Sequence, residues 1–442
     1  MDKQQIAFHK SRRENLLKQF DKHTLILVLG NPLKNKSFDG DYTFKQNKNF
    51  YYLTGFTEPN SALLLAPGGM KVRKGKNKFA TVKDILFVQE KDKLKETWTG
   101  VRLGFENVTK ELGIQHGILN ADIYSILLAN LTPEINKFYI NVHDFYALTG
   151  EMKKYLADLY EKIITMTSNV QICDINYTIG KMRNVKTPYE ITLMKISADI
   201  CVNAFDDAIR QVRPDLYEYQ IQSVLQYNYK LYGAMDDAFD AIVASGNNAC
   251  TLHYEENRDK LKNGDLLLID SGAEYQYYNS DITRTIPING KFSKEQREIY
   301  ELVLKVQKEI IKKTKPGVKL SYLKKYTVDA LAEGLLKLKI IKNKKEVTKY
   351  YMHSVGHHLG LDTHDACKNT FDDKFDFDIL KAGNVITDEP GIYIPKDAKE
   401  APAKYRGIGV RIEDDLLVTK TGCENLTGDL AKEVNDLEEI MK

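Results

Sequence analysis

The 442-residue chain lacks the features that mark secreted, membrane-embedded or nucleic-acid-binding proteins. No apolar run approaches the roughly 20 residues needed to span a bilayer. The amino-terminal sequence MDKQQIAFHKSRREN has no apolar core and does not read as a secretion signal. The net charge is only +3, although lysine is abundant, so charge gives no argument for a nucleic-acid or membrane partner. We therefore expect a cytoplasmic protein that binds neither.

Cysteine is scarce and forms no recognisable pattern. The five cysteines are odd in number and show no metal-type spacing, so reduced thiols in a cytosolic protein are the simplest interpretation. Internal repeats and low-complexity linkers are also missing. With 43% apolar and 28% charged residues, the composition is that of a soluble globular protein. At 442 residues the chain is too long for one ordinary hydrophobic core, so we expect two domains.

The amino-terminal part alternates strand-like and helix-like segments, which is typical of an α/β layer. Buried strands are expected at residues 24–30, 62–67 and 84–90, and helices at 105–112, 123–131 and 150–165. This part has no clustered acids or histidines and no glycine-rich phosphate loop, so we do not expect it to carry the chemistry by itself. The pattern changes near residues 176–186, and the predicted domains are residues 1–175 and 176–442.

The second domain begins with a helix start signal. Thr187 can cap a helix that has Pro188 in its first turn and Glu190 at the third position. The rest of this domain groups strands apart from helices, which favours an α+β architecture. Helices are expected at residues 191–212, 217–232, 294–313 and 320–338, and strands at 241–245, 265–274, 280–287, 383–387 and 408–419.

Four carboxylates and one histidine of this domain are candidate metal ligands. Each lies within or at the end of a short apolar run, where a buried acid is tolerated when it is paired or binds a metal. Five ligands with four oxygen donors are too many for one tetrahedral zinc, but they suit two divalent ions that share carboxylates. The candidates are Asp270, Asp281, His357, Glu389 and Glu413.

Local patterns indicate how these acids are presented. Asp270 and Asp281 flank a plausible hairpin turn, the sequence YYN, which would place both carboxylates on one face of neighbouring strands. Glu389 precedes a proline, which favours an extended conformation at the end of a strand. Alternation in GVRIE places Arg411 and Glu413 on the same face. Taken singly, the acids have structural alternatives: a turn residue, a strand end, and an ion pair between Arg411 and Glu413.

Histidines are concentrated in the same domain. A single one of them would more often be a satisfied core histidine, but their grouping near four acids favours a functional site. Glycines and the spacing of the group favour an irregular passage over a helix. The clustered histidines are His253, His353, His357, His358 and His364.

Ordered motifs in this half resemble those of a known family. The segments LHY, IDSGAEYQYYNSDITRTIPINGKF, HSVGHHLGLDTHD, DEPGIY and GVRIED are similar to those of the pita-bread metallopeptidases, and most of all to Xaa-Pro aminopeptidases (aminopeptidase P). In the amino-terminal half, NKNFYYLTGFTEPNSALLLAP and ETWTGVRLG, with the single tryptophan Trp98, resemble the leading domain of those enzymes. The resemblance covers most of the chain. It implies an α/β amino-terminal domain followed by an α+β pita-bread (creatinase/aminopeptidase-like) catalytic domain.

The resemblance also implies the metal ligands. Asp281 and Glu413 would bridge two metal ions, Asp270 would bind one of them, and His357 and Glu389 would bind the other. The implied metal is Mn²⁺, with Zn²⁺ and Co²⁺ as alternatives, because affinity order and cellular supply both intervene.

Further roles follow from the same resemblance. His253 and His364 would contact the substrate and the tetrahedral intermediate, Glu389 would transfer protons, and His353 and Arg411 would support the site from outside. The implied partners are peptides with proline in the second position. Relatives are commonly dimers or tetramers, so a homo-oligomer is expected.

The implied reaction is hydrolysis of the amino-terminal Xaa-Pro bond by a metal-bridging hydroxide. Two cations about 3.5–4 Å apart lower the pKa of a shared water and make hydroxide available near neutral pH. A proline pocket is not evident in the sequence. Tyr254, Phe239 and Tyr393 are possible walls, although each could equally be ordinary packing.

Two segments depart from the family pattern, and alternatives remain. The run MDDAFD before Ala241 is less aromatic than in relatives, and CKNTFDDKFDFDI after Ala366 lacks their glycine-rich loop and arginine. Both would line the rim of the substrate site, so the prediction of the metal chemistry is more secure than any prediction of substrate length.

The nearest alternative function is that of an Xaa-Pro dipeptidase (prolidase). A metal-free creatinase-like hydrolase and a non-catalytic pita-bread binding module are the others, and the intact ligand set opposes both.

Overall fold

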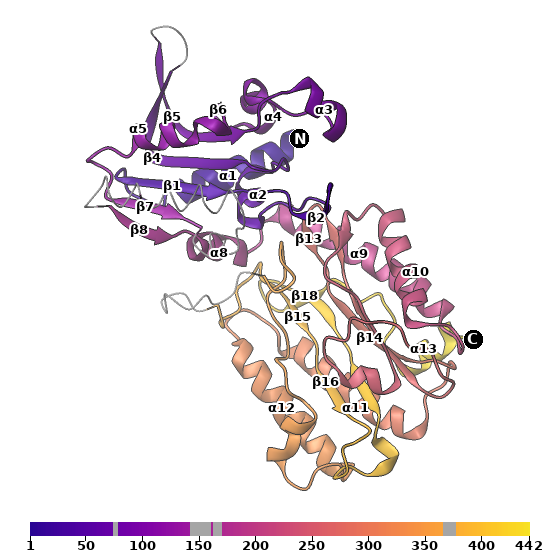
Figure 1. The fold of residues 1–442 in the computed structure, drawn as a ribbon. Coiled ribbons are helices and arrows are strands. Elements are labelled where there is room, and N and C mark those ends of the chain that lie inside the picture. The colour runs from indigo at the N-terminus through magenta and orange to yellow at the C-terminus, as the bar shows by residue number, and fades with distance from the viewer. Residues whose placement is uncertain (74–77, 142–160, 162–169, 366–376) are drawn as a thin grey trace. The chain divides into compact units, whose positions relative to one another are not determined.

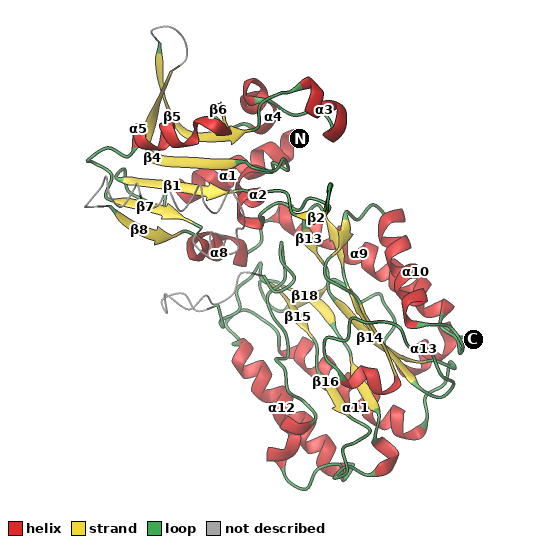
Figure 2. Cartoon of the chain, viewed as in Figure 1, coloured by secondary structure: helices red, strands yellow, loops and turns green. Residues whose placement is uncertain are grey.

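The computed structural model describes the chain except for residues 74–77, 142–160, 162–169 and 366–376 (Figure 1). The chain divides into two compact units, Met1–Gly180 and Lys181–Lys442, which are considered separately below. Both combine helices with strands (Figure 2). None of the described helices is long and apolar enough to cross a membrane. The helix expected at residues 150–165 lies outside the described residues, Glu161 excepted.

The first unit is built on a mixed six-stranded sheet with the order β6-β5-β4-β1-β7-β8. Its α/β class agrees with the sequence prediction. The β4 and β5 strands extend beyond the predicted apolar segments because they pair with each other as one long antiparallel hairpin. The elements are α1 (Lys3–Leu17), β1 (Thr24–Leu29), β2 (Asn35–Ser37), β3 (Gly40–Asp41), α2 (Lys48–Thr54), β4 (Ala62–Arg73), β5 (Phe79–Val88), α3 (Lys93–Thr99), η1 (Phe105–Asn107), α4 (Val108–Leu112), β6 (His116–Leu119), η2 (Asn120–Asp122), α5 (Ile123–Asn130), β7 (Lys137–Ile140) and β8 (Gln171–Asp174).

Both faces of this sheet are covered, which explains the continuous apolar run of its central strand. In β1, Leu25 and Leu27 pack into the cluster that includes Ile123 and Leu127 of α5. Successive side chains of a strand point to opposite faces, so the intervening Ile26 faces the other side, where α1 and α2 contact β1 and β4. Every residue of β1 is buried.

The second unit contains the site and several small sheets. Helices α9 and α10 pack on each other. Helix α9 also packs on β12 and β13, α10 packs on β9 and β10, and α11 packs on β15, β16, β17 and β19. The sheet orders are β10-β11-β14, β13-β12-β9, β15-β18-β19 and β16-β17. The elements are α8 (Asn176–Asn184, which begins in the first unit), α9 (Pro188–Gln211), α10 (Glu218–Leu231), β9 (Asp236–Asp237), β10 (Ile242–Ser245), η3 (Gly246–Cys250), β11 (Leu266–Ser271), β12 (Ala273–Tyr275), β13 (Tyr278–Asn279), β14 (Ile282–Pro287), α11 (Lys294–Lys313), α12 (Leu320–Lys337), η4 (Lys344–Lys349), β15 (Val385–Asp388), β16 (Gly391–Ile394), η5 (Ala403–Tyr405), β17 (Ile408–Arg411), β18 (Asp414–Val418), β19 (Cys423–Asn425) and α13 (Val434–Ile440).

The predicted start of α9 is confirmed in atomic detail. The Thr187 side chain accepts from the backbone N–H of Glu190, and the Glu190 carboxylate accepts from the backbone N–H of Thr187 at 2.8 Å. Pro188 occupies the first turn, where a missing N–H costs nothing. Helix α11 has the predicted bounds, again behind a capping box.

The hairpin predicted between Asp270 and Asp281 is present, but its turn is displaced. β11 and β14 pair antiparallel with Asp270 opposite Thr283, so both acids lie at the same end of two neighbouring strands. The reversal occurs at Gln276 and Tyr277, which adopt positive φ values of 46° and 70°, so the turn begins one residue before YYN and overlaps it only at Tyr277. The sequence did not predict this turn because non-glycine residues seldom adopt that conformation.

Candidate active site

A cavity of about 690 Å³ in the second unit contains every candidate residue of the sequence. Its walls are otherwise formed by apolar and small polar side chains and by two further acids, Asp240 and Glu255. The nine candidates that line it are His253, Asp270, Asp281, His353, His357, His364, Glu389, Arg411 and Glu413. Residues up to 160 positions apart are therefore brought together by the fold, while their chemical roles stay predictions.

The four acids reach the cavity from the ends of different strands. Asp270 lies in β11, Asp281 directly precedes β14, Glu389 directly follows β15, and Glu413 sits between β17 and β18. Asp281 and Glu413 are 4% and 2% exposed, so their carboxylates are shielded from water. The backbone N–H of Glu413 donates to the carbonyl of Thr283 at 3.0 Å, which couples its strand to β14.

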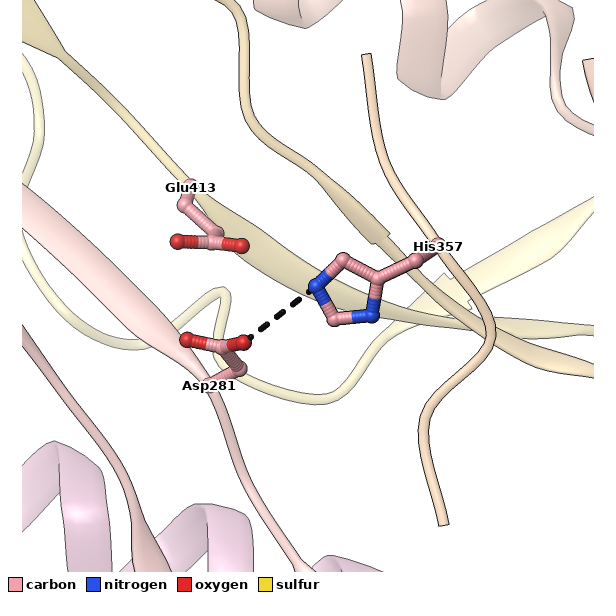
Figure 3. A group of neighbouring side chains, drawn as sticks. All are labelled: Asp281, His357 and Glu413. Carbon is pink, nitrogen blue, oxygen red and sulfur yellow. Dashed lines mark ion pairs between the residues drawn. The ribbon is translucent and has the colours of Figure 1, made fainter. Parts of the chain in front are cut away.

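Three of the predicted ligands converge most closely. One ligand atom each of Asp281, His357 and Glu413 lies within 4.8 Å of the others. Figure 3 shows the two carboxylates side by side, with the His357 ring directed at them from a separate segment of chain. His357 Nε2 is 3.5 Å from Asp281 Oδ2 and 3.8 Å from Glu389 Oε1.

His357 presents a lone pair to these carboxylates. Burial, together with nearby His364, lowers the pKa of His357 to about 3, so its ring is neutral near pH 7. Its Nδ1 lies 3.1 Å from the carbonyl oxygen of His358, which can only accept, so Nδ1 carries the proton. Nε2 is then an acceptor that faces the carboxylate oxygens of Asp281 and Glu389. A cation at this point would satisfy all of them.

The carboxylates repel one another in a buried setting. Burial, and then the charges of Glu413 and Asp270, raises the pKa of Asp281 well above its usual value. Burial, and then the charges of Glu389 and Asp270, does the same to the pKa of Glu413. Burial raises the pKa of Glu389 to about 8, although Arg411 acts in the opposite direction. These groups ionise together only with additional positive charge.

Asp270 is held by Arg411 through one oxygen. Arg411 Nη2 donates to Asp270 Oδ2 at 2.5 Å, and Arg411 Nη1 donates to the Tyr393 hydroxyl at 3.0 Å. The buried Asp270 Oδ1 has no hydrogen-bond partner within the described part of the chain. The alternative of an Arg411–Glu413 hydrogen bond is not observed, because Glu413 Oε2 accepts from Thr283 Oγ1 at 2.6 Å. One oxygen of Asp270 thus remains for a metal ion.

His353 closes a polar network behind the ligands. Burial lowers the pKa of His353 to about 4, so the ring is neutral. Its Nδ1 donates to the Ser354 carbonyl at 2.7 Å, and its Nε2 therefore accepts from the Tyr393 hydroxyl at 2.8 Å. Nδ1 also lies 3.5 Å from Glu389 Oε2. Arg411, Tyr393 and His353 thus form one chain of hydrogen bonds that begins at Asp270 and ends beside Glu389.

His364 is brought to the ligands by an irregular segment, as the glycine spacing predicted. Residues 351–365 contain no helix or strand, apart from a bridge between His358 and Ile386. The ring centroids of His357 and His364 are 4.2 Å apart. The neighbouring Asp365 is 1% exposed and forms ion pairs with Arg183 and, at 2.9 Å, with Lys186. This buried ion-pair cluster anchors the end of the segment.

The observed donors fit divalent cations. The histidine offers a lone pair, one buried carboxylate oxygen has no partner, and three carboxylates have raised pKa values because of burial and mutual repulsion. An oxygen-rich set with one imidazole suits a borderline-hard divalent ion better than a thiolate-preferring one. Cys367, which follows the histidine cluster in the sequence, lies outside the described residues.

Some residues that line the cavity or contact its side chains were not found from the sequence. Thr283, which binds both Glu413 and Arg411, follows Asp281 by two positions, so strand alternation could have identified it. Of the three suggested pocket walls, Phe239 lines the cavity, whereas Tyr254 and Tyr393 do not. The apolar wall instead includes Ile242 and Leu252, and Asp240 and Glu255 also line the cavity.

Sequence profiles identify the family. The profile of Metallopeptidase family M24 matches residues 192–420, and that of the aminopeptidase P N-terminal domain matches residues 9–139. The chain belongs to metallopeptidase family M24. Membership implies divalent metal binding and a metallo-aminopeptidase activity, and it confirms the pita-bread catalytic fold behind an aminopeptidase P-type leading domain.

Individual relatives cover both domains. The chain is 38% identical over 440 residues to Xaa-Pro aminopeptidase of Haemophilus influenzae, covering 98% of this chain and 96% of that protein. It is 35% identical to human Xaa-Pro aminopeptidase 3, and the match covers 94% of this chain and 80% of the human protein. A solved structure of Escherichia coli aminopeptidase P with the inhibitor Pro-Leu matches with a TM-score of 0.88 and 32% sequence identity. The match covers 99% of this chain and 98% of that chain.

The anchor of the His364 segment generates a stability prediction. Asp365→Ala leaves the buried Arg183 and Lys186 without this carboxylate, and breaking a buried pair costs about 3–5 kcal/mol. Amide hydrogen exchange in β15 and β18 should accelerate accordingly. Trp98 lies in the first unit, so its fluorescence does not report on this change.

The matched control for this variant is Asp206→Ala. It removes an ion pair with Arg210 on the surface of α9, where the two side chains are 38% and 53% exposed, and should leave the exchange rates close to those of the wild type because exposed pairs contribute little to stability. Equal exchange rates in the two variants would contradict the anchoring role.

Proposed function

We propose that this metallo-aminopeptidase hydrolyses the amino-terminal Xaa-Pro bond of peptides with two divalent ions, Mn²⁺ in the cell. The observation that carries the proposal is the convergence of Asp270, Asp281, His357, Glu389 and Glu413 in one cavity, with a neutral imidazole nitrogen 3.5 Å from a carboxylate oxygen. The named relatives, which are Xaa-Pro aminopeptidases, support the substrate class.

The proposed ligand assignment follows the resemblance to the pita-bread metallopeptidases, and the electrostatics of the site are compatible with it. Asp281 and Glu413 would each contact both ions, and the charges of Asp270 and Glu389 act on both of these carboxylates. Asp270 would bind one ion, and His357 and Glu389 the other. When bound, the pair of ions would lower the pKa of a water and polarise the scissile carbonyl.

The residues around the ligands would handle protons and charge. Glu389, 3.5 Å from His353 and 3.8 Å from His357, is placed to take up the proton of the attacking water and to deliver it to the departing imino nitrogen. His364 and His253 line the cavity and would donate to the developing oxyanion. Arg411 and His353 would hold Asp270 and Glu389 in place through Tyr393.

The proline preference would come from the apolar side of the cavity. The imino nitrogen of proline carries no N–H in the peptide bond, so its pocket needs no acceptor there. Phe239, Ile242 and Leu252 provide an apolar wall. An Xaa-Pro dipeptidase would use the same ligands, but the match of the leading domain to aminopeptidase P supports longer substrates.

The remaining assignments belong to the same proposal. We infer a cytoplasmic homo-oligomer, a dimer or tetramer, with domains at residues 1–175 and 176–442. Apolar side chains at the surface of the first unit support self-association, since Leu94, Trp98 and Val101 are 80%, 88% and 86% exposed.

A peptide series tests the substrate and the metal together. The protein should release the first residue of Xaa-Pro-Yaa-Zaa peptides, lose this activity on chelation and regain it with Mn²⁺, because the ions provide the attacking water. Xaa-Ala-Yaa-Zaa peptides of equal length are the control for proline. Cleavage of Xaa-Pro dipeptides alone would indicate the dipeptidase, and no metal-dependent hydrolysis would contradict the proposal.

Ligand variants separate metal binding from catalysis. Asp281→Ala and Glu413→Ala should abolish metal binding and activity together, as measured by elemental analysis and turnover. His364→Ala should keep its metal but lose about 10²- to 10³-fold in kcat, the usual effect of removing one oxyanion donor. Asp206→Ala, an exposed acid on α9, is the control. Full turnover in His364→Ala would show that its assigned role is wrong.

A further inference from the structure

One wall of the cavity is formed by an irregular segment that needs external support. Residues 246–258 contain only the short η3 helix, and no strand pairing holds the part beyond it. Leu252, His253 and Glu255 of this segment line the cavity. Because no regular element fixes this part, side-chain hydrogen bonds must determine where His253 lies.

A single buried carboxylate supplies many of these hydrogen bonds. Glu218 is the first residue of α10 and is 0% exposed. Its Oε1 accepts from the backbone N–H and the hydroxyl of Ser245, both at 2.7 Å, and from Asn248 Nδ2 at 3.1 Å. Its Oε2 accepts from the Tyr254 hydroxyl and from the backbone N–H of Asp259, both at 2.8 Å.

These donors lie on both sides of His253 in the sequence. Ser245 and Asn248 precede it, and Tyr254 and Asp259 follow it. All five hydrogen bonds come from neutral groups, and within the described residues Glu218 has no ion pair. The carboxylate is therefore the common acceptor that closes the segment into one conformation.

Tyr254 extends this support toward the polar network of the site. It directly follows His253, and its ring packs against the apolar cluster of Ile242, Ala244, Ala249, Leu268 and Tyr393. The hydroxyl of Tyr393 is the one bound by His353 and Arg411. The residue that follows His253 is therefore fixed at its hydroxyl by Glu218 and at its ring by the wall of the site.

We propose that Glu218, acting through Tyr254, is the positioning residue that holds His253 against the substrate. The inference rests on the proposed function, in which His253 contacts the developing oxyanion. Glu218 itself does not line the cavity, so it acts only through the segment. A purely structural role would change stability without any dependence on the His253 side chain.

The test variant is Glu218→Gln, which keeps the volume and one oxygen. Its amide nitrogen cannot accept, so either three donors at Oε1 or two at Oε2 lose their acceptor. We expect kcat/KM on an Xaa-Pro-Yaa-Zaa peptide to fall by about 10- to 100-fold, the effect of a misplaced catalytic contact. Metal content should equal that of the wild type, because no ligand is touched.

A double-mutant cycle with His253→Ala separates positioning from general damage. If Glu218 acts through His253, adding Glu218→Gln to the His253→Ala protein changes kcat/KM by no more than about twofold. If Glu218→Gln lowers kcat/KM by the same factor in the wild-type and His253→Ala proteins, the proposal is overturned. The wild type reports on the proposed function separately: its failure to cleave the peptide contradicts that function, whereas cleavage with an additive cycle contradicts the positioning role alone.

A second variant and a matched control complete the experiment. Tyr254→Phe removes one hydroxyl donor and should lower kcat/KM by less than Glu218→Gln does. This decrease should also disappear in the His253→Ala background. If Glu218→Gln does not fold, the Tyr254→Phe variant decides the question. Glu298→Gln is the control, because Glu298 also lies on a helix of this unit and accepts from a tyrosine hydroxyl, that of Tyr405, but lines no part of the cavity. It should change stability and leave kcat/KM within about twofold.

Discussion

The site depends on negative charge that the protein has buried without balancing it. Asp281, Glu389 and Glu413 share one cavity, and burial together with their mutual repulsion raises their pKa values. Arg411, the single arginine among the described residues that line the cavity, is hydrogen-bonded to Asp270. Ionised carboxylates in such a setting require partners of opposite charge. The neutral His357 turns a lone pair toward them and adds no charge.

The fold keeps this arrangement rigid through strand pairing and one buried guanidinium. Arg284, 0% exposed, donates to the Asp414 carboxylate at 2.8 Å and to the carbonyl groups of Thr283 and Glu413. These contacts join β14 to the junction of β17 and β18, from which Asp281 and Glu413 project. The acids are thus held together by backbone geometry on regular elements, which is what a preorganised metal site needs.

Local sequence patterns predicted the parts of the site that depend on local structure. Antiparallel pairing around Asp270 and Asp281 was expected from a turn between two apolar runs, and the structure shows this pairing. Arg411 and Glu413 both line the cavity, as strand alternation indicated, although Glu413 lies between two strands and not within one. The turn at Gln276 was missed because its conformation is rare for non-glycine residues. The ligand set and its proposed roles came from the order of the motifs, since no periodicity relates residues so far apart.

Long-range polar support could not be predicted in the same way. Glu218 binds donors 27 to 41 positions away, and Asp365 binds Arg183 at a separation of 182. In the sequence, each is one acid among 61 acidic residues, with no pattern that distinguishes it from a solvated surface carboxylate. Their importance appears only when burial and donors are known. The residues that position a site are therefore harder to find than the residues that form it.

Anomalous diffraction from crystals grown with Mn²⁺ tests the central claim most directly. The account predicts two peaks about 3.5–4 Å apart in the cavity. Both should lie within about 2.0–2.2 Å of carboxylate oxygens of Asp281 and Glu413. A cavity without anomalous density, with these carboxylates protonated and paired with each other, would contradict it.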